Sequence, residues 1–180
     1  MKTLSTKLLS TLLAHALAAA MLATLFLGFF GVALAGEPFS LQTHKTEVYG
    51  TRDLESGDYD QAISKLERWH RWARNSQLLR GPVLINLCVA YTAKREFAAA
   101  EEFCDAAVEN GRSLAVAYNN RGVMNAARGD YLAAVMDFES ARNRGGQRIA
   151  RDNLLLAQTR LRSTSDGAML ASIDPGPAQQ

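Results

Sequence analysis

Residues 129–141 read GDYLAAVMDFESA, and residues 57–69 read GDYDQAISKLERW. When Gly57 is aligned with Gly129, a third and more divergent copy, REFAAAEEFCDAA, fits at residues 95–107. Apolar and small residues recur at steps of three and four, which places them on one face of a helix. These positions are Tyr59, Phe97 and Tyr131; Ala62, Ala100 and Ala134; Leu66, Cys104 and Phe138; and Trp69, Ala107 and Ala141. Each copy predicts an amphipathic helix entered through a tight turn.

A second helical pattern precedes each copy, at residues 43–56, 81–94 and 115–128. Each carries a small residue seven places before the turn: Gly50, Cys88 and Gly122. We expect this residue to let two antiparallel helices approach closely, with the alanine of the second helix as its partner. Gly-Asp pairs form the first and third turns and supply helix caps, whereas Arg95-Glu96 specifies the middle turn less well.

The copies start 38 and 34 residues apart. A helix-turn-helix unit of about 34 residues resembles the tetratricopeptide repeat (TPR). The resemblance covers about residues 43–148, although the closing proline of the family is missing. It implies an all-α fold, a right-handed α-solenoid of three repeats. The alternative is an unrelated helical bundle, in which alanine and leucine at helical spacing are also common.

The last repeat needs a cover, because its apolar face would otherwise be exposed. Residues 147–162, QRIARDNLLLAQTRLR, are expected to form this capping helix, which gives a TPR-like domain at 43–162. Residues 163–180 contain two prolines, two glycines and little apolar periodicity, and are expected to be a disordered tail.

Residues 1–35 have the pattern of a secretory signal peptide: Lys2 and Lys7, a long apolar run, and Ala33-Leu34-Ala35 before Gly36. Cleavage before Gly36 would leave a short linker at 36–42 and a periplasmic or secreted protein. Because a membrane span needs about 20 apolar residues, an uncleaved anchor facing the periplasm is the alternative.

Loss of the leader removes two lysines and no acid, so the formal net charge falls from +2 to zero. A neutral domain has no general electrostatic attraction to nucleic acid. The sequence has no recognisable phosphate loop or nucleophile elbow, and no histidine at metal-ligand spacing from other ligands. We therefore expect no enzyme, metal or cofactor. An envelope enzyme with an unrecognised site is the remaining alternative.

By resemblance, the first helices line a concave groove that binds a partner peptide or helix. The matching positions are Glu47, Thr51, Ile85, Asn86, Val89, Asn119, Asn120 and Val123, with His44 and Val116 beside them. An amide side chain both donates and accepts, which suits a ligand backbone; Asn86 and Asn120 either do this or bond within the repeat. Relatives that hold a free carboxylate use lysine and arginine, which are absent from these positions.

Cys88 and Cys104 lie on facing helices of the second repeat, and export makes an oxidising compartment the expected one. These positions predict a disulfide, with two buried free thiols as the alternative. The combined expectation is an exported, non-catalytic TPR adaptor of the bacterial type. It would hold together components of the cell envelope, or serve as an anchored accessory subunit if the leader is retained.

Overall fold

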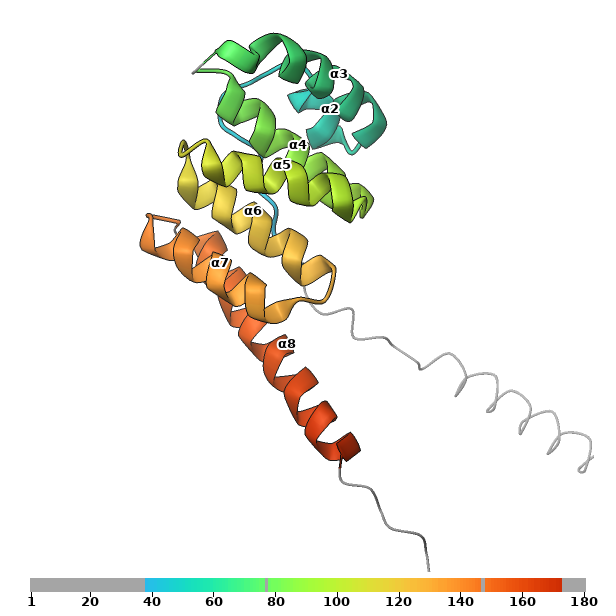
Figure 1. Ribbon diagram of the computed structural model, residues 1–180, viewed down its shortest axis with the longest axis vertical. Coiled ribbons are helices and arrows are strands. Elements are labelled where there is room, and N and C mark those ends of the chain that lie inside the picture. Colours follow the sequence, from blue (N-terminus) through green and yellow to red (C-terminus); the bar gives the residue numbers. More distant parts are fainter. Residues whose placement is uncertain (1–37, 77, 147, 173–180) are drawn as a thin grey trace, which may run out of the picture. The chain divides into compact units, whose positions relative to one another are not determined.

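The computed structural model describes residues 38–76, 78–146 and 148–172. All regular elements in this part are helical, which confirms the all-α expectation (Figure 1). The predicted leader, the first two linker residues and the last eight residues lie outside the described residues. The helices are α2 (Thr51–Ser56), α3 (Tyr59–Trp72), the 3₁₀ turn η1 (Ala73–Asn75), α4 (Arg80–Lys94), α5 (Phe97–Glu109), α6 (Leu114–Ala127), α7 (Tyr131–Asn143) and α8 (Arg148–Ser172).

Pairs of antiparallel helices stack as an α-solenoid: α2 with α3, α4 with α5, and α6 with α7. The two Gly-Asp turns behave as expected. Gly57 and Gly129 adopt left-handed backbone (φ +84° and +94°), and Asp58 and Asp130 cap the next helices by accepting from Gln61 N and Ala133 N. The middle turn places Arg95, a non-glycine residue, at φ +62°, and Glu96 forms no side-chain cap. Its weaker specification is therefore visible in the backbone.

The close approach of the paired helices occurs at the small residues. In the first repeat a Cβ on Gly50 would lie 3.0 Å from the carbonyl oxygen of the expected partner, Ala62, but in the third repeat the partner differs from the expected alanine. A Cβ on Gly122 would lie 2.7 Å from the ring of Phe138, not against Ala134. Phe138 lies one turn beyond Ala134 on α7, and both are fully buried. In the second repeat the same place holds Cys88 and Cys104, which form a disulfide with their Cα atoms 4.7 Å apart.

The first repeat differs from expectation, because its first helix is only six residues long. Residues 43–50, expected to be helical, are instead an extended and turned segment. Gly50 at φ +107° precedes α2, and Thr51 Oγ1 accepts from the N–H of Val48. The segment from Phe39 to His44 crosses α6 and α4 before the chain enters α2 (cyan in Figure 1). Residues 39–42 are therefore part of the folded domain and not a free linker.

Helix α8 packs on α7 and covers the last repeat, as the capping helix was expected to do. It continues to Ser172, ten residues past the predicted boundary at 162. The hydroxyls of Ser163, Thr164 and Ser165 donate to carbonyls three and four residues earlier, so these polar residues are accommodated in the helix. No helix of the described part is long and apolar enough to cross a membrane.

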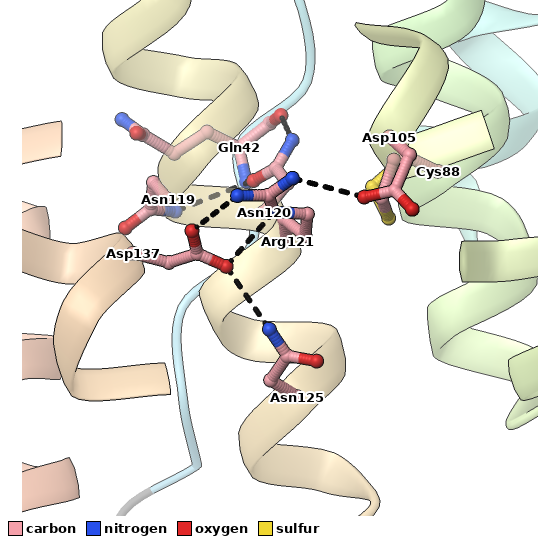
Figure 2. The surroundings of a disulfide bond; sticks show 9 residues. Gln42, Cys88, Asp105, Asn119, Asn120, Arg121, Asn125 and Asp137 are labelled. Atoms are coloured by element: carbon pink, nitrogen blue, oxygen red, sulfur yellow. Dashed lines mark hydrogen bonds and ion pairs between the residues drawn. A yellow bond between two sulfur atoms is a disulfide. The ribbon is translucent and has the colours of Figure 1, made fainter. Parts of the chain in front are cut away.

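A charged cluster joins the second and third repeats (Figure 2). Arg121 on α6 donates two hydrogen bonds to Asp137 on α7, at 2.7 and 3.0 Å, and a third to Asp105 on α5 at 2.9 Å. Asn125 also donates to Asp137, whose side chain is only 7% exposed. The hydrogen bonds that Arg121 donates to Asp137 raise the pKa of Arg121 further above its usual value. This cluster fixes α6 between its neighbours and so fixes the groove residues that α6 carries.

Candidate functional site

Side-chain amides from three helices bind the backbone of the extended segment at alternate residues. Asn120 accepts from Gln42 N at 2.9 Å and donates to Gln42 O at 2.7 Å. Ser40 N donates to Asn153 Oδ1 at 2.9 Å, and Ser40 O accepts from both Asn119 and Asn153 at 3.0 Å. His44 N donates to Asn86 Oδ1 at 2.8 Å. In an extended chain the N–H and C=O of one residue point to the same side, so every second residue meets an asparagine.

We call these four residues the asparagine ladder: Asn86 on α4, Asn119 and Asn120 on α6, and Asn153 on α8. The side chain of Asn153 also donates to Asn119 Oδ1 at 2.9 Å, and Asn119 donates to Asn120 Oδ1 at 3.3 Å. Asn86 Nδ2 donates to Thr51 Oγ1 at 3.1 Å. These links orient the amides before any backbone binds them. The ladder therefore bonds this segment of the chain through its backbone alone.

The sequence reasoning assigned Asn153 to the capping helix and missed its place in the ladder. The signal was present, because Asn153 follows Asn119 by 34 residues, and Asn120 follows Asn86 by the same interval. Figure 2 shows the resulting pairing of Gln42 with Asn120, beside the cluster of Arg121 and Asp137. In the structure Asn86 and Asn120 bond within the chain, to the backbone of His44 and Gln42.

Phe39 and Leu41, which alternate with the bonded residues, contribute apolar side chains. The ring of Phe39 stacks on that of Phe138 with centroids 5.9 Å apart and planes 13° apart. Leu41 packs against two core clusters, one containing Val89 and the other Val123. The floor of the groove is therefore apolar, as expected for its middle, while its amides supply the polar contacts.

The other candidate positions do not face an open groove. Ile85 is fully buried in a cluster with Leu84, Ala107 and Ala117. Thr51 is buried and its hydroxyl is already bonded within the chain. Glu47 is exposed and forms an ion pair with Arg52 at 2.8 Å. Glu47 lies in the part of the first repeat that was expected to be helical and is extended instead, whereas Ile85 faces the core between α4, α5 and α6.

His44 is the last residue of the segment and lies at the end that contacts α4. Its Nδ1 accepts from Thr46 N at 2.9 Å, and its Nε2 lies 2.9 Å from Ser113 Oγ. Burial lowers the pKa of His44 below its ordinary value of 6.5. His44 also lines a pocket of about 650 Å³ together with Lys45, Gly111, Ser113, Leu114, Ala115, Val116 and Arg144. This pocket leaves open space immediately beyond the end of the bound segment.

A second surface feature lies on α3. Tyr49, Arg68, Trp69 and Trp72 line a shallow pocket of about 480 Å³, in which Trp72 is 73% exposed. The two tryptophans meet edge to face with centroids 5.2 Å apart. None of these residues belongs to the asparagine ladder. Within the described ranges, no group of histidine, cysteine, aspartate and glutamate side chains could hold a metal ion.

No protein-family model and no curated protein sequence matches the chain. Among solved structures, the first TPR domain of Spaghetti (RPAP3), bound to the HSP90 peptide SRMEEVD, is similar to it. The similarity has a TM-score of 0.55 and 25% sequence identity, and it covers 63% of this chain and 87% of that one. The stacked helix pairs, the repeat interval and this likeness agree: the chain has a TPR-like fold of helical repeats.

Proposed function

We propose that this protein is an exported, non-catalytic adaptor that binds an extended segment of another protein in the groove formed by α4, α6 and α8. The asparagine ladder carries the proposal. Four buried amides on these three helices bind a peptide backbone at every second residue. Such amides are costly to bury unless they are bonded, so their arrangement suits a groove built around an extended chain.

The similar TPR domain of Spaghetti supports a peptide as the ligand class, since it was solved with a bound peptide. The recognition proposed here differs in its chemistry. The groove offers amide groups and an apolar floor, where a carboxylate clamp would need lysine or arginine. We therefore propose an internal, extended and partly apolar segment as the partner, without a requirement for a free C-terminus.

Export to the cell envelope, in the periplasm or outside the cell, is supported by the signal-like residues 1–35 and by the Cys88–Cys104 disulfide. Disulfides persist in oxidising compartments and are rare in the cytosol. The intact mass of the native protein tests this part. A chain that begins at Gly36 supports secretion, whereas a chain that begins at Met1 supports the membrane-anchored alternative.

Photo-crosslinking in living cells tests the groove. A crosslinking amino acid replaces Lys45, which is exposed beside the groove, or Met136, which is 63% exposed on α7. We expect a defined protein adduct at position 45 that disappears when Asn86→Ala and Asn120→Ala are added, and no such adduct at position 136. Adducts only at position 136 would show that partners bind elsewhere. Adducts at position 45 that persist after Asn86→Ala and Asn120→Ala would show the same.

A further inference from the structure

The segment from Phe39 to His44 meets the groove as a bound peptide would. Its six hydrogen bonds to the asparagine ladder all use its backbone, at Ser40, Gln42 and His44. Its two apolar side chains, Phe39 and Leu41, alternate with these residues and pack on the clusters below. The groove therefore already contains an occupant with the chemistry of its proposed partner.

The occupant lies on the surface of the domain. Ser40 is exposed, and Phe39, Leu41, Gln42 and His44 are only half-buried. The buried residue Val48 marks where the chain becomes part of the core, because it packs there and its N–H donates to Thr51. Residues 45–47 between these parts are exposed and include a bend. The segment can therefore leave the groove about this bend while the stacked helices stay packed.

Release of the segment leaves no polar group stranded. The ladder amides are buried while the segment is bound. Water that enters the vacated groove can replace the hydrogen bonds that they lose when the segment leaves. The same amides can equally bind another extended backbone, since they contact no side chain of residues 39–44. Selectivity among partner segments must then come from two apolar contact positions in the groove. One is the face of Phe138 and the other is the floor below Leu41.

We propose that residues 39–44 are a displaceable internal ligand that occupies the groove until a partner replaces it. The partner is an extended protein segment with an aromatic residue and an aliphatic residue two positions later, as in Phe39-Ser40-Leu41. This rests on the proposed function of the groove. Because the internal ligand is tethered, it competes at an effective concentration on the order of millimolar, so a partner binds only if its affinity overcomes that competition.

The test uses the protein from Gly36 onward and a fluorescein-labelled peptide of residues 36–44, GEPFSLQTH, added in trans. In one variant, Phe39→Ala and Leu41→Ala weaken the internal ligand while all helices stay intact. Binding is followed by fluorescence anisotropy. We expect the peptide to bind this variant at least tenfold more tightly than the unchanged protein. A peptide with both alanines should bind the variant at least tenfold more weakly than GEPFSLQTH does.

Ser40→Ala is the matched control, because the Ser40 side chain is exposed and only its backbone contacts the ladder. It should leave trans-peptide affinity unchanged. Equal affinity for the variant and the unchanged protein would place the peptide on another surface and overturn the proposal. Failure to bind a variant that keeps its helical circular dichroism would make the segment a fixed part of the fold. A dimer of the unchanged protein that dissociates in the variant would mean that the segment occupies a neighbour's groove, which also overturns the intrachain form.

Hydrogen exchange on the unchanged protein gives a second measurement that needs no variant. The amides of Gln42 and His44 are bonded to the ladder, and they should exchange at least tenfold faster than amides in the middle of α6. Exchange at the same rate as α6 would contradict release. If release fails here but the crosslink at position 45 still depends on the asparagines, the internal-ligand proposal is wrong and the groove function stands. If the segment is not released and the crosslink at position 45 does not depend on the asparagines, the proposed groove function is wrong as well.

Discussion

Cys88 and Cys104 form a disulfide at the place in the second repeat where Gly122 meets Phe138 in the third. In the first repeat Gly50 meets Leu66 in the same way: a Cβ on Gly50 would lie 3.1 Å from Leu66 Cγ. Each pair joins a residue of the helix before the turn, or just before that helix, to one of the helix after it. The disulfide therefore fills a space that the neighbouring repeats fill by packing alone.

This equivalence predicts how the disulfide can be replaced. Cys88→Gly with Cys104→Leu should be more stable than Cys88→Ala with Cys104→Ala, by about 1–4 kcal/mol. Burying leucine in place of alanine contributes about 2–5 kcal/mol, and glycine in a helix costs about 1 kcal/mol of that. Both variants should lie below the parent, because the lost cross-link alone is worth about 3 kcal/mol. Urea denaturation measures all three. Equal midpoints for the two variants would refute the equivalence.

Gly122 should not tolerate even one added methyl group. Gly122→Ala gains about 1 kcal/mol in helix propensity. The new Cβ would lie 2.7 Å from the ring of Phe138, which is fully buried. Overpacking of this kind costs about 1–3 kcal/mol, so a net loss of stability is expected. In a thermal-unfolding cycle, Gly122→Ala should be harmless or stabilising in a Phe138→Leu background. The same loss in both backgrounds would exclude Phe138 as the obstacle.

The sequence was sufficient to predict the repeat register, because the residues that set it are local. Gly57-Asp58 and Gly129-Asp130 specify both a left-handed turn and the next helix cap. The alanines three residues into each second helix are fully buried. The weaker middle turn could also be predicted, because Arg95 stands where the other two turns have glycine.

The course of residues 39–48 could not be predicted in this way, because its determinants are distant in sequence. Gln42 is bonded to Asn120, 78 residues later, and Ser40 to Asn153, 113 residues later. Read locally, THKTEVYGTRDLES matches the helix that the other repeats have at this place. Residues 43–50 do not form a helix, because Gly50 adopts φ +107° and because the asparagine ladder bonds the backbone of His44 in an extended segment. The amides of Asn86 and Asn120 were singled out from sequence, but the segment that they bond was not predicted.

Two aspartates that share Arg121 should contribute unequally to stability. The side chain of Asp137 is 7% exposed and accepts from both Arg121 and Asn125, whereas that of Asp105 is 48% exposed. Asp137→Asn removes a buried charge partner without creating a cavity and should cost about 1.5–3 kcal/mol. Asp105→Asn should cost less than about 1 kcal/mol, because water screens that pair. Chemical denaturation at low and high salt compares them; a larger loss at Asp105 would contradict this assignment.

His44 should make release of the internal ligand sensitive to acid. Its pKa is lowered by burial, and protonation of Nδ1 would remove the acceptor for Thr46 N–H. Because the pKa is lower in the bound state than in the released state, the full stability of the bound segment is present above pH 6.5. It is lost as the pH falls through 6.5 toward the lower bound-state value. Each unit of pKa difference corresponds to about a tenfold change in the ratio of released to bound segment.

The amide resonance of Gln42, followed by nuclear magnetic resonance between pH 7.5 and pH 5, reports this release locally. A local probe is necessary because the pKa of His70 is also lowered, first by burial and then by Arg80, so global unfolding depends on acid as well. His44→Gln should abolish the change at Gln42 while leaving the acid dependence of global unfolding in place. His70→Gln should do the reverse. A Gln42 resonance that responds to acid equally in the presence and absence of His44 would show that the imidazole does not hold the segment.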